Sequence, residues 1–169
     1  MTGGRPTIAY GTRYVTNPVN PRAVTVEASI GVPNDSDVHK QYPLMGTTGR
    51  PSVVHFASAL HWTHTGKQLN GVRLVQIHPS TAGRLGIANG DEVVVESPRG
   101  AVTGTALHWE GIREDTIFVP NTFGPAQEFG DQFGQPRYNP VNELVDDRFH
   151  DNLSGQQAYK CFACRVRKA

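Results

Sequence analysis

The chain has 169 residues and a net charge of +1, from 16 basic and 15 acidic side chains. A chain of this length forms one sizeable core with extensions, and its balanced charge excludes both a generic basic field for nucleic acid and an acidic tail for a basic partner. With 37% hydrophobic residues, 18 glycines and 12 prolines, the composition favours a loop-rich β protein over a helical bundle.

The first 40 residues are predicted to form an extended arm that packs on a partner. Asn-Pro pairs at residues 17–18 and 20–21 interrupt this region. After them, apolar residues alternate with polar or small ones at Val24, Val26, Ala28, Ile30 and Val32. A period of two is typical of a half-buried strand. The alternative for the arm is a floppy tail.

Residues 41–169 are predicted to form a mainly β domain. We expect strands over residues 44–48, 73–77, 92–96, 101–107, 116–120 and 160–166. A short helix over 79–85 begins at Pro79, whose missing N–H costs nothing in the first turn, and ends at Gly86 in a left-handed cap. Asn89-Gly90-Asp91 and Ser97-Pro98-Arg99-Gly100 are predicted turns on either side of a hairpin strand.

Two loops are longer than structural connections usually are. One covers residues 52–71, and the other runs for about forty residues after Pro120. Loops of this kind often carry function on a rigid scaffold. The fold class is therefore mainly β, a barrel with one or two short helices and long functional loops.

A series of short motifs follows Thr47 in a particular order. They are Thr48-Gly49-Arg50, His61-Trp62-Thr63-His64-Thr65-Gly66, Ile77-His78-Pro79, Arg84-Leu85-Gly86-Ile87, Asn89-Gly90-Asp91-Glu92-Val93, Ser97-Pro98-Arg99-Gly100, residues 118–124, residues 139–144 and residues 159–166. In this order they resemble the C-terminal domain of the dimethyl sulfoxide reductase family of molybdenum and tungsten oxidoreductases, which includes nitrate reductases and formate dehydrogenases.

The resemblance implies a double-psi β-barrel that clamps molybdopterin guanine dinucleotide against metal-bearing domains. In that family the metal ligand and any iron–sulfur cluster lie in the other domains, and neither region is present in this sequence. We therefore expect a separately encoded small subunit or a fragment, which binds the cofactor but is not a self-sufficient enzyme. Its expected partners are a large molybdenum or tungsten subunit and an iron–sulfur subunit.

Thr48, Gly49 and Arg50 stand where a predicted strand ends and the chain turns. Glycine lets backbone N–H groups approach a diphosphate closely, and arginine supplies a planar cation with several donors. A Gly-Arg pair on its own is more often an ordinary turn. The resemblance assigns these residues to cofactor contact.

The resemblance also assigns His61, Trp62, His64 and Thr65 to a loop that contacts pterin and phosphate oxygens. The family spacing is His-Trp-His-Thr-Gly, and here Thr63 is inserted before the second histidine. Under a shifted alignment, His55 and Phe56 take the place of His61 and Trp62. A zinc site and plain surface histidines are the alternatives, and zinc lacks a third ligand nearby.

Four further residues are expected to contact the cofactor. Asn121 and Phe123 follow an apolar strand, where an amide pairs with a heterocycle edge and a ring stacks on pterin. A turn with a core phenylalanine is the alternative. The resemblance places Asn142 on the cofactor and gives Lys160 the neutralisation of a cofactor phosphate.

The remaining polar clusters are expected to be structural. Cys161 and Cys164 form a single C-x-x-C, which is weak evidence for metal or redox chemistry, and both are predicted to pack. The basic end of the chain, Arg165, Arg167 and Lys168, is either a solvated tail or a contact to the large subunit. The acidic cluster of Asp146, Asp147 and Asp151 with His150 is predicted to be a solvated face.

The sequence predicts a cytoplasmic protein without direct membrane insertion. The opening residues lack an apolar core and a twin-arginine pair, and no apolar run is long enough to cross a bilayer. Folded export with a signal-bearing partner is the alternative.

A competing hypothesis from another class is a double-psi barrel without molybdopterin. Such barrels also serve as interaction modules and as small enzymes. The His-Trp-rich loop argues against this hypothesis, because those modules do not need it.

Overall fold

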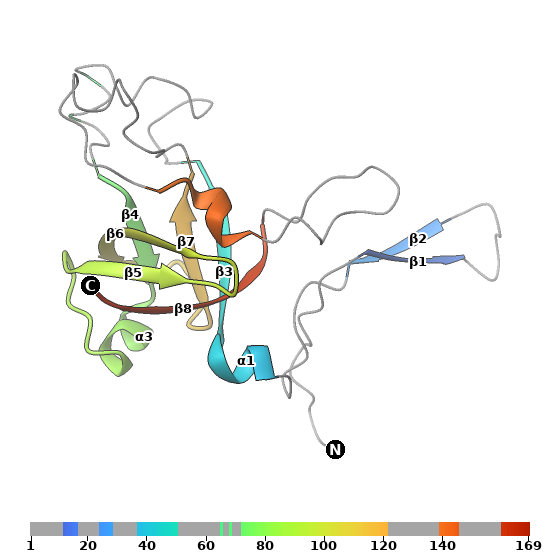
Figure 1. Ribbon diagram of the computed structural model, residues 1–169, viewed down its shortest axis with the longest axis horizontal. Helices are drawn as coiled ribbons and strands as arrows, with labels where there is room; N and C mark the ends of the chain where they lie inside the picture. The colour runs from blue at the N-terminus through green and yellow to red at the C-terminus, as the bar shows by residue number, and fades with distance from the viewer. Residues whose placement is uncertain are drawn as a thin grey trace.

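The computed structural model describes residues 12–16, 24–28, 37–50, 65, 68, 72–121, 139–145 and 160–169. In the arm, β1 (Thr12–Thr16) and β2 (Val24–Ala28) pair antiparallel in a two-stranded sheet of their own (Figure 1). The alternation predicted one strand here, and β2 confirms it. β1 is a second strand that the sequence reading missed. The division of the chain at residue 40 stays a prediction.

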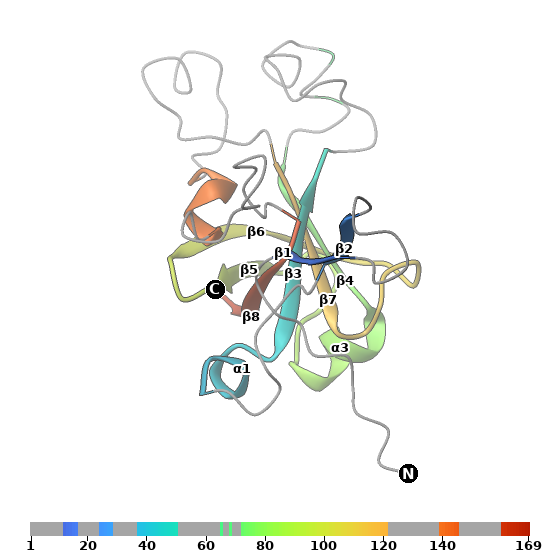
Figure 2. The same ribbon diagram turned by 90° about the vertical axis from the view of Figure 1, so that its right-hand side faces the viewer.

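The described part of the chain beyond the arm is built around a closed barrel. Its elements are α1 (Asp37–Gln41), β3 (Leu44–Gly49), β4 (Leu74–Ile77), α3 (Pro79–Arg84), β5 (Glu92–Glu96), β6 (Ala101–His108), β7 (Thr116–Pro120), the 3-10 helix η3 (Val141–Leu144) and β8 (Phe162–Lys168). The strands follow the order β3-β7-β4-β6-β5-β8 around the barrel (Figures 1 and 2).

Two strand pairs of the barrel are parallel, β3 with β7 and β4 with β6, and the other neighbours are antiparallel. The predicted class, a mainly β double-psi barrel with one or two short helices, is confirmed. The last strand lies two residues later than predicted, over Phe162–Lys168 instead of 160–166. The helix α1 was not predicted, and it spans the expected boundary between arm and barrel.

The barrel core comes from alternate residues along the strands, whose side chains face inward. These are Val75, Ile77, Val93, Val95, Val102, Ala106, Ile117, Val119, Cys164 and Val166, each no more than 4% exposed. Full burial of a valine or isoleucine side chain contributes about 1.5–3 kcal/mol. From η3, Val141 and Leu144 add to the same cluster. Because the strands close into a barrel around this core, the strand order determines which strand ends are neighbours.

The helix α3 has the ends that the sequence predicted. Pro79 occupies its first turn, and the side chain of His78 accepts a hydrogen bond from the Ser80 N–H through Nδ1 at 3.2 Å. Gly86 has a φ of 67°, the left-handed conformation expected of a helix terminator. The turn before β5 also uses this region, since Gly90 has a φ of 90°.

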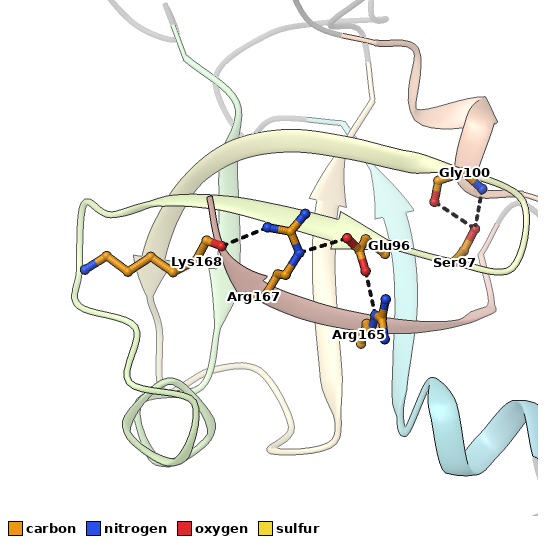
Figure 3. A network of polar contacts seen from close by, with 6 residues as sticks. All are labelled: Glu96, Ser97, Gly100, Arg165, Arg167 and Lys168. Carbon is orange, nitrogen blue, oxygen red and sulfur yellow. Dashed lines mark hydrogen bonds and ion pairs between the residues drawn. The ribbon is translucent and has the colours of Figure 1, made fainter.

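The basic end of the chain is part of the outer surface of the barrel. Figure 3 shows the carboxylate of Glu96 between Arg165 and Arg167, at 2.5 and 2.9 Å. Lys168 pairs with Asp91 at 2.8 Å. These exposed cations lie in β8 and are ion-paired, so they belong to a strand and do not form a tail. A contact to the large subunit stays a prediction.

The ion pairs of Glu96 predict a pH-dependent contribution to stability. Hydrogen bonds from Arg165 and Arg167 lower the pKa of Glu96 from its ordinary value of 4.5. The contribution is therefore present above pH 4.5 and is lost as the pH falls through the lower pKa of the folded state. We expect Glu96→Gln to lower the free energy of unfolding by about 1 kcal/mol at neutral pH.

Urea unfolding at neutral and strongly acidic pH tests this expectation. The difference between wild type and Glu96→Gln should vanish in acid, where the carboxyl group is protonated in both states. Glu92→Gln is the matched control, because Glu92 lies exposed on the same strand. A loss that is equal at both pH values would show that the charge of Glu96 is not its source.

Candidate functional site

The ends of β3 and β7 lie side by side at one end of the barrel. The parallel register pairs Thr48 with Val119 and Gly49 with Pro120. The backbone N–H of Asn121 donates to the Gly49 carbonyl at 2.8 Å. Two predicted site segments, far apart in the sequence, therefore meet here because β3 and β7 are neighbours in the barrel.

Lys160 reaches the same place from the start of β8. Its Nζ donates to the backbone carbonyl of Thr48 at 2.8 Å, across 112 positions of sequence. Lys160 is exposed, whereas Thr48 is buried. We call the group formed by Thr48, Gly49, Asn121 and Lys160 the barrel rim. Four of the residues predicted from the sequence are thus brought together.

Asn121 has an acceptor that the described residues leave unsatisfied. Its Oδ1 is buried and has no hydrogen-bond partner within the described parts of the chain. Leaving a buried acceptor unsatisfied costs about 1–3 kcal/mol. Such groups in a folded protein call for a specific explanation. A ligand that brings a donor to the rim would supply one.

Gly49 is required by packing as well as by its place at the rim. A Cβ at this position would lie 2.7 Å from Cε2 of Phe118, whose ring covers β3 from β7. The half-buried Phe118 therefore explains why this position needs a glycine, and the sequence alone did not show this reason.

Three other predicted residues are described, and two of them, Arg50 and Asn142, lie at or near this end. Arg50 is exposed and directly follows β3. Asn142 is exposed on η3, which lies at the end of the barrel where β3 and β7 terminate (Figures 1 and 2). Thr65 is exposed and helical. Their roles toward a cofactor stay predictions.

Several of the sequence predictions fall outside the described residues. These are His61, Trp62, His64 and Phe123, the alternatives His55 and Phe56, and the cluster Asp146, Asp147, His150 and Asp151. Within the described residues, no group of three or more His, Cys, Asp or Glu side chains is placed to hold a metal ion.

The two cysteines have the environment of structural residues. Cys164 is fully buried, and burial raises the pKa of its thiol. Cys161 is half-buried, and its pKa is also raised by burial. Because the thiolate is the reactive form, a raised pKa opposes redox or metal chemistry. The prediction that Cys164 packs is confirmed, and Cys161 packs only in part.

One buried charged residue was missed by the sequence reading. Arg73 is fully buried, and it has the same parity along the strand as the inward-facing Val75 and Ile77. Its guanidinium donates to the carbonyl of Thr103 at 3.0 Å and to that of Asn139 at 2.6 Å. An arginine at the same strand parity as core positions is the signal that could have found it.

The family model described as "Molydopterin dinucleotide binding domain" matches residues 44–163. The chain belongs to this family. The match covers all six barrel strands at least in part and includes the whole rim. The resemblance to the dimethyl sulfoxide reductase family is confirmed, and so is a molybdopterin dinucleotide as the cofactor type. The competing barrel without molybdopterin finds no support.

Relatives of this molybdopterin domain are much longer proteins. Dopamine dehydroxylase of Eggerthella lenta is 33% identical over 137 residues, which is 81% of this chain and 13% of the relative. The assimilatory nitrate reductase catalytic subunit of Bacillus subtilis is 35% identical over 112 residues, 62% of this chain and 16% of that protein. The chain thus spans a small part of the relatives that it matches.

The fold also agrees with a solved structure. Acetylene hydratase from Pelobacter acetylenicus superposes with a TM-score of 0.68 and 24% identity, over 79% of this chain and 19% of the other. This likeness supports the barrel architecture. Among the described residues, no helix is long and apolar enough to cross a membrane.

Proposed function

We propose that this chain is the cofactor-clamping subunit of a molybdenum or tungsten oxidoreductase, and that the metal centre lies in a partner chain. The observation that carries the proposal is the barrel rim. There the buried Oδ1 of Asn121 has no donor among the described residues, and the cationic Lys160 contacts the Thr48 carbonyl of the same strand end. A molybdopterin guanine dinucleotide offers both N–H donors and phosphate oxygens. The rim therefore fits the family's cofactor chemically.

Two rim residues, Lys160 and Asn121, and the predicted site residues Arg50 and Asn142 offer two kinds of contact. The cations of Lys160 and Arg50 suit the diphosphate, since charge-assisted hydrogen bonds to phosphate are strong. The amides of Asn121 and Asn142 suit the edges of the pterin and guanine rings, because an amide both donates and accepts. When bound, the cofactor supplies the metal-based electron transfer, and this chain supplies binding, orientation and charge neutralisation.

The size of the relatives supports a proposal for the rest of the assembly. The matched regions are 13% and 16% of two long relatives. We propose that a large partner subunit provides the metal ligand, that an iron–sulfur subunit accompanies it, and that residues 1–40 pack on a partner. A cytoplasmic location stays part of the same proposal. Purification from the native source, with identification of the co-purifying chains, tests this arrangement.

Cofactor analysis tests the binding function directly. The chain is produced in a host that makes the dinucleotide, and pterin and GMP released by acid are measured per mole of protein. We expect both in the wild type. We expect Lys160→Ala to retain about tenfold less, because one charge-assisted phosphate contact is lost.

The matched control is Lys40→Ala in α1. Lys40 is also exposed, and its side chain pairs with Asp37 at 2.9 Å. Its variant should retain the wild-type amount of pterin. Wild-type protein free of pterin and GMP would refute the proposed function. Equal retention by the two lysine variants would refute only the role of Lys160.

A further inference from the structure

Arg73 lies at the rim end of the barrel and donates to two backbone carbonyls of the described residues. It directly precedes β4, and this strand begins at the rim because it runs antiparallel to β7. Its guanidinium is fully buried and donates to carbonyls on two different segments, Thr103 of β6 and Asn139 before η3. Burial of a charged group is unfavourable unless hydrogen bonds offset the loss of water. Arg73 therefore ties these two segments firmly together.

Asn139 connects Arg73 to η3 through hydrogen bonds. Its carbonyl accepts from Arg73 at 2.6 Å, and its Nδ2 donates to the carboxylate of Glu143 at 3.0 Å. The Glu143 N–H in turn donates to the carbonyl of Pro140 at 3.0 Å. The position of Asn139 thus governs the start of the short helix that carries Asn142.

A second contact places η3 against the start of β6. A Cβ at Gly100 would lie 2.9 Å from the Glu143 carbonyl oxygen, so the two backbones approach as closely as glycine permits. In addition, the η3 residues Val141 and Leu144 are buried in the barrel core and anchor the helix there. The helix is consequently held at the end of the barrel where β3 and β7 terminate (Figures 1 and 2).

We propose that Arg73 is a positioning residue for cofactor retention, which holds η3, and with it Asn142, at the barrel rim. The inference rests on the proposed function and extends it to a residue that itself lies inside the barrel. Arg73 acts through Asn139 and η3, so its effect on the cofactor depends on Asn142. This dependence separates positioning from a general contribution to stability.

The test is the rate at which the cofactor-loaded chain releases pterin. We expect Arg73→Met to release it about tenfold faster, the usual scale for residues that orient a binding group. Asn142→Ala should have a similar effect. The double variant should release pterin no faster than the quicker single variant, because both changes disable the same element. Multiplied effects would overturn the inference.

Two variants keep the test usable if Arg73→Met does not fold. Arg73→Lys retains a cation but offers one ammonium group to two carbonyls, and its release rate should lie between those of wild type and Arg73→Met. Gly100→Ala leaves Arg73 intact and pushes the Glu143 carbonyl, so it should also speed release. Unchanged release in Gly100→Ala and Arg73→Lys would overturn the inference.

The control separates a displaced helix from a weakened barrel. Val166→Ala removes a buried side chain of β8 and should lower stability with unchanged pterin release at temperatures where it is folded. Amide exchange should accelerate over 139–145 in Arg73→Met and not in Val166→Ala. A wild type without pterin overturns the proposed function and this inference together. A loaded wild type, with Arg73→Met and Gly100→Ala releasing at its rate, overturns the inference alone.

Discussion

Replacing Gly46 by alanine is expected to lower the free energy of unfolding by about 3 kcal/mol, near the upper end of the usual cost of overpacking. Gly46 lies in β3 opposite Phe162 of β8. A Cβ at this position would overlap the ring of Phe162, with Cδ2 only 2.6 Å away. The ring is 3% exposed and belongs to the core, so it cannot move aside without disturbing its neighbours.

Urea or guanidinium unfolding of three variants distinguishes a clash with Phe162 from the effect of replacing any glycine by alanine. Gly83→Ala is the control, because no atom lies within 4 Å of a Cβ there and α3 gains a better helix former. We expect it to be neutral or slightly stabilising. The double variant Gly46→Ala with Phe162→Leu should recover part of the loss. A Gly46→Ala protein as stable as wild type would contradict the predicted clash.

Asn121→Leu is expected to have opposite effects on the empty and the loaded protein. Without cofactor, removal of a buried oxygen that lacks a partner in the described structure should leave stability unchanged or raise it by about 1 kcal/mol. The backbone hydrogen bond to the Gly49 carbonyl is retained, since leucine also has an N–H. With cofactor, retention should fall at least about tenfold, because a buried ligand donor loses its acceptor.

Asn89→Leu is the matched control. Its Oδ1 accepts from the N–H of His108 at 2.8 Å, so the same substitution here removes a satisfied acceptor and should destabilise the protein by about 1 kcal/mol. His108 pairs with Ile77 at the end of β4 that is remote from the rim, and retention should not change. Thermal unfolding with and without bound cofactor measures both effects. Destabilised empty Asn121→Leu protein would show that Oδ1 is satisfied in solution.

The effects expected at Gly46 and Asn121 both depend on how the barrel brings together residues that are distant in the sequence. Lys160 and Thr48 are 112 positions apart, and their contact exists only because β3 lies between β7 and β8. The resemblance proposed both residues for the site without placing them in contact. For Asn121, its place after an apolar strand predicted a position at the barrel rim. The unsatisfied Oδ1 depends on the exact surroundings, which no local pattern contains.

Local signals in the sequence determined most of the barrel's elements. Period-two alternation, Pro79 at the start of α3, and Gly86 and Gly90 with positive φ are local properties of backbone and side chain, and the structure confirms them. The order of motifs also identified the family. The short elements α1 and β1 were missed, because neither segment has a clear periodicity.

The tertiary structure alone decided how the polar residues are used. Arg73 stands at the same alternation as the core residues of β4, yet an arginine before a strand is normally at the surface. Only the closed barrel shows that it is buried and hydrogen-bonded to Asn139. The basic end became an ion-paired strand face because β8 lies beside Glu96 of β5. Such contacts are set by strand order and register, which depend on long-range packing and not on local sequence.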